Sequence, residues 1–375
     1  MVRIELKEIV SNYDNKRKAL NAVERGNKKT NPQYPYYGAN GIVDFIDEYI
    51  FDEELLCIAE DGGNWGYKQN CSYIVNGKYW VNNHVHVLKP KKNVEIKYLM
   101  YYLNYTDLTS YITGTTRGKL TRTALDKIQI NLPELEIQRE IVIILDKINN
   151  LIEKNKKRII YLEELVKSRF IEMFGDPIKN DKGWDKIFIE EIASLVSRGK
   201  TPKYVEKSKI GVINQACVYW EKTKFENIKY HEDKKDILIL QDQDILINST
   251  GTGTLGRVNI FMKNEEKDII YTIDTHITLL RLKQWKSNSI YLKNYFRIPI
   301  IQKYLINKCV NGSTNQIELS KEKFNNFRVL LPPLSLQNEF SQFVEKTDKL
   351  KFEAEKSLKE MENLYDSLMQ KFFKQ

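Results

Sequence analysis

Apolar residues recur at heptad spacing in two stretches of the chain, each of roughly 38 residues. In the first stretch, one column of the pattern contains Leu145, Ile152, Ile159, Val166 and Met173. In the second stretch, 199 residues further along, the same column contains Val344, Lys351, Leu358, Tyr365 and Phe372. Heptad spacing is typical of an amphipathic α-helix with one apolar seam, so both stretches are predicted to be long helices.

Each predicted helix would be about 57 Å long, and a polar helix of that length is stable only when its seam is buried. The simplest partner for one seam is the other seam. If the two halves of the chain are related by a two-fold axis, the helices run antiparallel. The polar residues Asn155 and Lys351 interrupt the apolar columns and are candidates for fixing the register. The alternative is that each helix packs on its own domain.

The sequence around the helices repeats at the same distance. Residues 132–140 (LPELEIQRE) precede and begin the first helix, and they reappear as residues 331–339 (LPPLSLQNE) at the second. Both halves show the order strand, glycine loop, strand, tyrosine-rich helix, Gly-Ser/Thr loop, strand, Leu-Pro and long helix. This period is far longer than the roughly 20–50 residues of solenoid repeats, so it indicates a duplicated domain.

These patterns predict an α+β protein, in which two quasi-repeated α/β domains are separated by two long helices that form an antiparallel coiled coil. The first helix is expected to stop at Gly175, because glycine suits the position after a helix and Pro177 prevents its continuation. The predicted segments are a first domain (1–133), a central helix (134–175), a second domain (176–331) and a C-terminal helix (332–375).

The chain of 375 residues carries a net charge of +9 and has a pI near 9.0. This charge favours a polyanionic partner, although a general lysine-rich bias would produce it too. No apolar run reaches the roughly 20 residues of a membrane span, and the N-terminus has no signal-peptide core. The four cysteines are far apart and lack metal-ligand spacing, which is typical of reduced core residues in a cytoplasmic protein.

Several short segments together resemble one protein family, the DNA-specificity subunits of type I restriction-modification systems. The segments are residues 34–42 (YPYYGANGI), 59–63 (AEDGG), 173–177 (MFGDP), 182–184 (KGW), 199–202 (GKTP), 331–334 (LPPL) and 337–340 (QNEF). Each motif is modest alone, but their order along the whole chain and the two-fold repeat agree with that family.

The resemblance implies that each globular part is a target recognition domain, which reads one half of a bipartite site in double-stranded DNA. It also implies that the helices set the gap between the half-sites and dock two methylation (M) subunits, and that restriction (R) subunits join the complex. S-adenosylmethionine and ATP would then bind to those partners, and this chain would bind no cofactor or metal. The chain is therefore expected to be a DNA-binding specificity subunit and not itself an enzyme.

Candidate DNA contacts follow from the chemistry of recognition. Lys and Arg on loops suit phosphates, and Asn, Gln, Ser, Thr, Lys and Arg on exposed loops suit base edges. In the first domain the candidates are Tyr37, Asn40, Trp65, Lys68, Arg117, Lys119 and Arg122. In the second domain they are Lys200, Thr201, Thr252, Thr254, Arg257, Thr314, Asn315 and Gln316. The matching loops differ strongly between the halves, so the two domains are expected to read different sequences. For each candidate, a plain solvated turn is the alternative.

No catalytic motif stands out in the sequence. Residues 31–34 (NPQY) lack the second proline of the Asn-Pro-Pro-Tyr motif of amino-methyltransferases, and residues 251–257 lack the ending of a phosphate-binding loop. His84 and His276 recur at equivalent positions in apolar runs and are interpreted as hydrogen-bonded structural residues. A self-contained DNA methyltransferase or nuclease with an unrecognised site is the alternative function, and a coiled-coil scaffold is a third.

Overall fold

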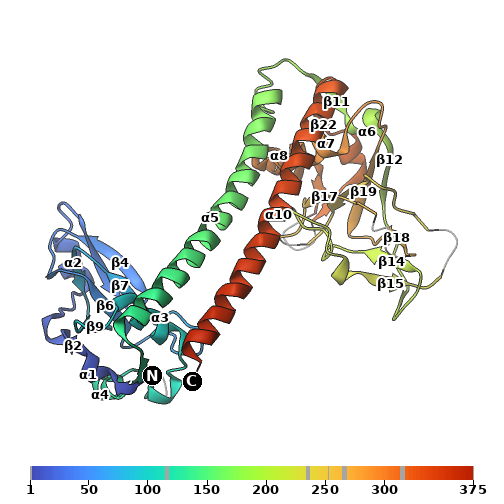
Figure 1. Ribbon diagram of the computed structural model, residues 1–375. Coiled ribbons are helices and arrows are strands. Elements are labelled where there is room, and N and C mark those ends of the chain that lie inside the picture. The colour runs from blue at the N-terminus through green and yellow to red at the C-terminus, as the bar shows by residue number, and fades with distance from the viewer. Residues whose placement is uncertain are drawn as a thin grey trace. The chain divides into compact units, whose positions relative to one another are not determined.

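The computed structural model describes residues 2–114, 118–233, 237–251, 253–263, 268–312 and 317–374. It confirms a mixed α+β architecture with two long helices (Figure 1). The chain divides into two compact units. Unit 1 comprises Met1–Lys156 and Glu355–Gln375, and unit 2 comprises Lys157–Ala354. Each unit thus contains one globular domain and one half of each long helix.

Two four-stranded sheets form the globular part of unit 1. The first has the order β2 (Val10–Asn12), β9 (Val85–Pro90), β6 (Leu55–Ala59) and β7 (Ser72–Val75), all antiparallel. The second has the order β4 (Gly41–Ile46), β3 (Tyr34–Gly38), β8 (Lys78–Val81) and β5 (Phe51–Asp52), with β3 and β8 parallel. A further pair joins β1 (Val2–Glu5) to β10 (Gln129–Leu132).

Strand β6 shows how the core of unit 1 is layered. All five of its residues are buried, and successive side chains of a strand point to opposite faces. Leu56 and Ile58 belong to the cluster that includes the tyrosine-rich helix α3 (Ile96–Tyr105), whereas Leu55 and Cys57 belong to a separate cluster with β8. Short helices complete the unit: α1 (Leu6–Ile9), η1 (Asp14–Lys16), α2 (Ala22–Asn27), η2 (Thr109–Tyr111) and α4 (Arg122–Asp126).

Unit 2 repeats this plan. Its first sheet has the order β12 (Ala193–Arg198), β19 (Ile277–Leu282), β16 (Ile245–Asn248) and β17 (Val258–Ile260). Its second sheet has the order β13 (Tyr204–Val205), β15 (Lys229–His231), β14 (Ile210–Ile213) and β18 (Ile270–Ile273), with β14 and β18 parallel as β3 and β8 are. The pairs β11 (Asp185–Phe188) with β22 (Arg328–Leu331) and β20 (Val310–Asn311) with β21 (Glu318–Leu319) are additional.

Short helices surround the sheets of unit 2 as they do in unit 1. They are α6 (Ile189–Ile192), η3 (Phe225–Asn227), α7 (Ser289–Arg297), α8 (Pro299–Cys309) and α9 (Lys321–Asn325). Helix α7 carries Tyr291 and Tyr295, which are buried like Tyr98 and Tyr102 of α3. The predicted duplication of the domain is therefore visible in both the strand order and the buried tyrosines.

The two long helices are α5 (Leu135–Phe174) and α10 (Leu334–Phe373), each of 40 residues. Every residue of the predicted seam is buried or half-buried. The contacts run antiparallel within each unit. In unit 1, Lys156 pairs with Glu362 and Asn155 donates to the Met361 sulfur at 3.3 Å. In unit 2, Lys351 pairs with Glu163 at 2.5 Å, and Arg169 pairs with Glu339 at 3.0 Å.

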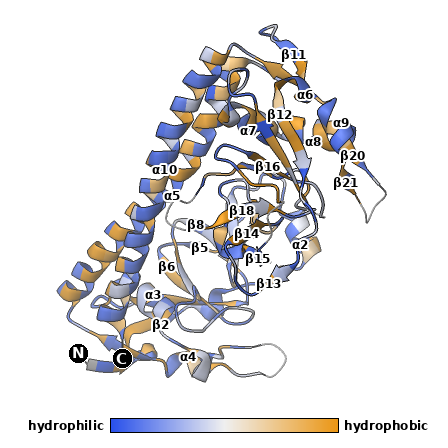
Figure 2. Cartoon of the chain, turned by 90° about the vertical axis from the view of Figure 1, so that its right-hand side faces the viewer, coloured by the Kyte–Doolittle hydropathy of each residue, from blue (hydrophilic) through white to orange (hydrophobic). Residues whose placement is uncertain are grey.

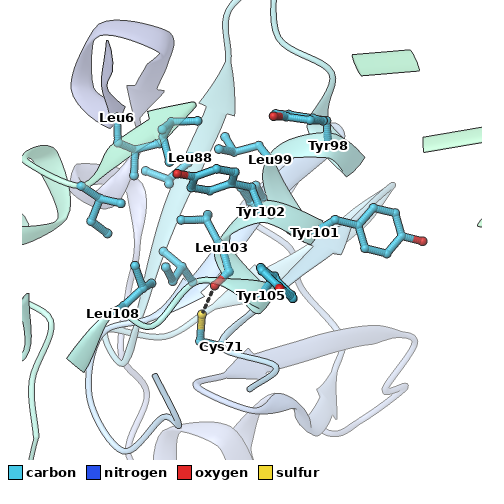
Figure 3. Packing of buried hydrophobic residues seen from close by; sticks show 14 of the residues in the cluster. Leu6, Cys71, Leu88, Tyr98, Leu99, Tyr101, Tyr102, Leu103, Tyr105 and Leu108 are labelled. Carbon is cyan, nitrogen blue, oxygen red and sulfur yellow. Dashed lines mark hydrogen bonds between the residues drawn. The ribbon is translucent and has the colours of Figure 1, made fainter. Parts of the chain in front are cut away.

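The last turn of each long helix fills the core of the other half's domain. In unit 1, Phe373 of α10 lies 5.4 Å from the ring of Tyr98 and 5.8 Å from that of Tyr102. In unit 2, Phe174 of α5 lies 4.8 Å from the ring of Tyr291. Phe174 and Phe373 are 199 residues apart, so they are equivalent in the repeat. Figure 3 shows the tyrosines of α3 around which this core is built. The alternative that each helix packs only on its own domain is therefore wrong.

A buried glutamine explains why the Leu-Pro motif recurs with Gln138 and Gln337. Both side chains are fully buried. The Gln138 amide donates to the Pro133 carbonyl at 2.8 Å and accepts from the Glu95 backbone N–H at 2.8 Å. Gln337 likewise donates to Pro332 at 2.7 Å and accepts from Asn288 at 2.9 Å. The glutamine therefore joins the start of the long helix to the start of the tyrosine-rich helix in each half.

Candidate nucleic-acid interface

Four loops of unit 1 meet at one end of its sheets. Backbone hydrogen bonds join Glu60 N–H to the His84 carbonyl at 2.9 Å and Leu120 N–H to the Glu60 carbonyl at 2.7 Å. Asn82 N–H donates to the Tyr37 carbonyl at 3.1 Å, so the turn before β9 is tied to the end of β3. We call this end the loop face of unit 1.

A hollow of about 410 Å³ opens on the loop face of unit 1. Its lining comes from the β3–β4 turn, the loop after β6, the β8–β9 turn and the segment around the start of α2. The residues with hydrogen-bonding side chains are Arg25, Tyr36, Asn40, Asp61, Asn82, Asn83 and His84. A Cβ atom on Gly38 would lie 2.7 Å from Val43 and 3.2 Å from Asn82, so glycine is required where the β3–β4 turn approaches the neighbouring loop. Such a hollow offers both donors and acceptors to a ligand.

A network of charged groups joins the loops of this face. Arg17 donates to Glu60 at 2.6 Å, and Lys119 pairs with Glu60 at 2.9 Å. Burial alone would raise the pKa of Glu60, but the hydrogen bonds from Arg17 and Lys119 outweigh it and lower that pKa. The buried His86 bonds Asp14 at 2.6 Å, and this contact lowers the pKa of Asp14 against the opposing effect of burial. The network therefore keeps both carboxylates ionised.

Unit 2 has the same backbone arrangement with different side chains. Ser249 N–H donates to the His276 carbonyl at 2.8 Å, and Leu319 N–H donates to the Ser249 carbonyl at 2.9 Å. Ser249 thus occupies the position of Glu60. The counterpart of Lys119 is Glu318, which forms an ion pair with Arg198. The polarity of the pair that holds this loop is therefore reversed between the units, and we call the corresponding end the loop face of unit 2.

Several of the candidates in unit 1 are placed near its hollow. Asn40 is exposed and donates to the Gly62 carbonyl at 3.3 Å, and Tyr37 is half-buried with its ring 5.7 Å from that of Tyr73. Lys119 lies beside Asp61 and is half-exposed. Arg117 lies outside the described residues. These placements leave Asn40 and Lys119 as accessible candidates on the loop face.

Other candidates in unit 1 have structural roles. Trp65 is only 7% exposed, donates its indole N–H to the Ala59 carbonyl and packs in the core, so it offers no surface to DNA and its prediction is wrong. Lys68 pairs with Asp366 of α10 at 2.9 Å. Arg122 pairs with Asp126 within α4 at 2.8 Å. Both cations remain partly exposed, and no contact of theirs with DNA follows from these positions.

The candidates in unit 2 divide in the same way. Lys200 and Thr201 are exposed and follow Gly199, where an added Cβ would lie 2.2 Å from the Asp274 and Ile273 carbonyls. The close approach places this loop beside the His276 turn. Thr254 and Arg257 bond carbonyls of their own loop, those of Thr250 at 2.9 Å and Gly253 at 3.1 Å. Thr252, Thr314, Asn315 and Gln316 lie outside the described residues.

His84 and His276 are the two histidines that were interpreted from the sequence as hydrogen-bonded structural residues. The side chain of His84 is 42% exposed and lines the hollow, unlike that of the nearby His86, which is buried. The Nδ1 atom of His84 bonds Asp61 at 2.9 Å, and the equivalent His276 bonds the Thr250 hydroxyl at 2.7 Å. The prediction that both are hydrogen-bonded is confirmed. Their recurrence at matching positions was the signal that pointed to the loop faces.

Neither a metal site nor a membrane span is found in the described part of the chain. The described residues contain no group of three or more His, Cys, Asp or Glu side chains that could hold a metal ion. None of the described helices is long and apolar enough to cross a membrane. All four cysteines are buried and free, and burial raises the pKa of the Cys71 thiol to about 12.

Comparison with known proteins identifies the family. The model of the type I restriction modification DNA specificity domain matches residues 1–164 and 181–363. The chain belongs to this family. A putative type I restriction enzyme specificity subunit of Haemophilus influenzae is 29% identical, over 92% of this chain and 87% of the relative. The MjaVIII specificity subunit of Methanocaldococcus jannaschii is 25% identical, over 88% and 84%. The relatives' names agree with a specificity subunit that is not itself an enzyme.

Solved structures share the fold. The S subunit of the type I restriction-modification system from M. genitalium superposes with a TM-score of 0.64 at 14% identity, covering 100% of this chain and 96% of that one. A chain from a study of complex assembly in the type I system gives a TM-score of 0.57 at 13% identity, covering 99% and 97%. The predicted fold class, two similar domains with two long paired helices, is confirmed.

Proposed function

From this family membership, we propose that the chain reads a bipartite site in double-stranded DNA, with one half-site at the loop face of each unit. The observation that carries the proposal is the pair of loop faces, which share backbone hydrogen bonds but differ in side chains. Ser249 replaces Glu60, and Glu318 replaces Lys119. Base readout depends on the donors and acceptors that a surface presents, so two such faces select different sequences.

The long helices would serve as the spacer and as the docking site for two methylation subunits. Four exposed leucines support this role. Leu151 of α5 and Leu364 of α10 are exposed in unit 1, and Leu165 of α5 and Leu350 of α10 are exposed in unit 2. Leu151 is equivalent to Leu350, and Leu165 to Leu364, at the repeat distance of 199 residues. Each unit thus presents one leucine from each helix, and apolar groups that gather in an exposed patch mark protein contacts.

Figure 2 shows that hydrophobic (orange) and hydrophilic (blue) positions alternate along both long helices. Two equivalent patches suit two copies of one partner. Restriction subunits would join the same complex, and S-adenosylmethionine and ATP would bind to the partner subunits. The proposed segments are the first recognition domain (1–133), the first spacer helix (134–175), the second recognition domain (176–331) and the second spacer helix (332–375). The proposed location of the protein is the cytoplasm.

A domain exchange tests the proposal. Residues 178–330 would be replaced by the matching part of a relative, and the complex with its methylation subunits would be mapped by single-molecule sequencing of methylated DNA. We expect one half of the methylated site to change and the other half to stay the same. A change in both halves would contradict separate reading. Sequence-specific methylation by the chain alone would favour a self-contained methyltransferase instead.

A further inference from the structure

His84 and His276 are held at the same point of the two loop faces. In unit 1, the Asn82 side chain accepts from the His84 backbone N–H at 2.8 Å, and the His84 carbonyl accepts from Glu60. In unit 2, Asp274 accepts from the His276 N–H at 2.9 Å, and the His276 carbonyl accepts from Ser249. The fold therefore presents an imidazole ring at this point in each half.

The imidazole rings of His84 and His276 have different hydrogen-bond partners. The Nδ1 atom of His84 bonds the Asp61 carboxylate, whereas that of His276 bonds the Thr250 hydroxyl. An ionised carboxylate only accepts hydrogen bonds, so the hydrogen must reside on Nδ1 of His84. A hydroxyl both donates and accepts, so either tautomer of His276 is compatible with Thr250.

The side chain of His84 is partly exposed, and His84 is one of the residues that line the hollow of unit 1. Among the described residues, no hydrogen bond to its Nε2 atom is found, and the ring lines the hollow with Asn40 and Asn83. When Nδ1 carries the hydrogen, Nε2 of the neutral ring is an acceptor. In the major groove, the amino groups of adenine and cytosine are the base groups that donate to such an acceptor.

We propose that His84 is a specificity-determining residue that accepts a hydrogen bond from the amino group of adenine or cytosine, and that Asp61 is the positioning residue that fixes its tautomer. His276 has the same place in unit 2, but Thr250 leaves its tautomer free. The first half-site is therefore discriminated more strictly at this base than the second half-site is at the equivalent base. This inference rests on the proposed reading of DNA by both loop faces.

The tautomer itself can be measured without DNA. The chain contains four histidines, so ¹⁵N-histidine labelling gives few signals, and His84→Gln and His276→Gln variants assign two of them. At mildly alkaline pH we expect His84 to carry its hydrogen on Nδ1. In Asp61→Asn the amide can donate or accept, so we expect a mixture of tautomers. A hydrogen on Nε2 of His84 in the unchanged chain would overturn the inference.

A second experiment measures base discrimination in the complex of this chain with its methylation subunits. In Asp61→Asn we expect discrimination at one position of the first half-site to fall about ten-fold, the equivalent of one hydrogen bond, with the second half-site unchanged. Asp52→Asn, an exposed aspartate of β5, is the matched control and should leave both half-sites intact. His84→Ala should lose the preference at the same position, and thermal melting would check that each variant is folded.

The outcomes separate this inference from the proposed function. If folded Asp61→Asn and His84→Ala variants keep the same base preference at every position of the site, the proposed role of His84 is overturned. The proposed reading of DNA would be unaffected by that result. If the unchanged complex methylates no defined site, the proposed function itself fails. Relaxation of both half-sites together in Asp61→Asn also contradicts the inference, because Asp61 belongs to unit 1 alone.

Discussion

The loop faces of units 1 and 2 use opposite charges for the same structural task. In unit 1 a lysine on the loop, Lys119, pairs with Glu60 at the end of β6, whereas in unit 2 a glutamate at the same place, Glu318, pairs with Arg198 at the end of β12. The backbone hydrogen bonds around them are retained. The fold therefore fixes where the loops meet. The side chains there are free to change as long as each buried charge keeps a partner.

The cores of the two units changed far less than their loop faces. Phe174 and Phe373 fill equivalent places among buried tyrosines, and Gln138 and Gln337 make equivalent hydrogen bonds. An unsatisfied buried polar group or a cavity costs free energy wherever it occurs, so these positions tolerate little variation. An exposed loop carries no such penalty.

The largest expected effect comes from removing the core aromatic of one unit. Phe373→Ala should destabilise unit 1, and Phe174→Ala unit 2, each by about 3–5 kcal/mol, because a large buried ring leaves a cavity. Hydrogen exchange read by mass spectrometry would locate the loss. Exchange should rise in α3 for the first variant and in α7 for the second. Phe352→Ala is the control, since that ring is 67% exposed and its loss should cost less than about 0.5 kcal/mol. If either variant increased hydrogen exchange equally in both units, Phe174 and Phe373 would not each stabilise a separate unit.

A second experiment asks whether the two leucine patches are equivalent docking sites. The double variant Leu151→Glu/Leu364→Glu should release the methylation subunit at unit 1. The double variant Leu165→Glu/Leu350→Glu should release the methylation subunit at unit 2. We expect each to lower the affinity about 100-fold, because a charge replaces apolar area that docking would bury. Light scattering on the purified complex should then give one methylation subunit per chain in place of two. Val43→Glu, at an exposed position on β4 of unit 1, is the control. Two bound subunits in both double variants would exclude these patches.

Acid should act in opposite directions on the buried carboxyl groups at the loop faces of the two units. The pKa values of Glu60 and Asp14 in unit 1 are lowered below 4.5 and 3.8, so the stability that these groups contribute is present above those values and is lost as the pH falls through the folded-state pKa. In unit 2, burial raises the pKa of Asp274 above 3.8, so its contribution is present at low pH and is lost as the pH rises through the raised value.

Hydrogen exchange followed from neutral pH to about pH 3 would test this difference, because the window extends below the ordinary carboxyl pKa values. Unit 1 should loosen first, and Glu60→Gln should remove part of its pH dependence. Asp274→Asn should remove part of the opposing dependence of unit 2. If acid loosened unit 2 first and neither variant altered the profiles, these carboxyl groups would not be the cause.

The smallest effect on the half-sites is expected from changing the spacer. Four residues inserted after Asn155 lengthen α5 by about 6 Å, close to two base pairs at about 3.4 Å each. Four residues also exceed one turn by about 40°, so some activity should be lost. Mapping of the methylated site should show an altered gap between two unchanged half-sites. An active variant with the original gap would show that the helix pair does not set the spacing.

The sequence predicted the framework better than the loop faces, for a physical reason. Heptad periodicity and the repeat report burial directly, so α5, α10 and the seam at Leu145 and Val344 were predictable. Trp65 was misassigned because an aromatic residue in a glycine-rich loop looks exposed in sequence, whereas tertiary contacts with Gly63 and Gly118 bury it. The hollow at His84 was not predicted, because an apolar neighbourhood in sequence does not show that the turn before β9 lines a hollow.

Phe373 follows Tyr105, the last tyrosine of α3, by 268 residues. During synthesis on the ribosome, the first domain therefore emerges early but lacks a piece of its own interior until nearly the whole of α10 has been made. The second domain meets no such delay, because Phe174 is translated before it. Nascent chains should accordingly acquire protease resistance in the reverse of their synthetic order, with the domain made first maturing last.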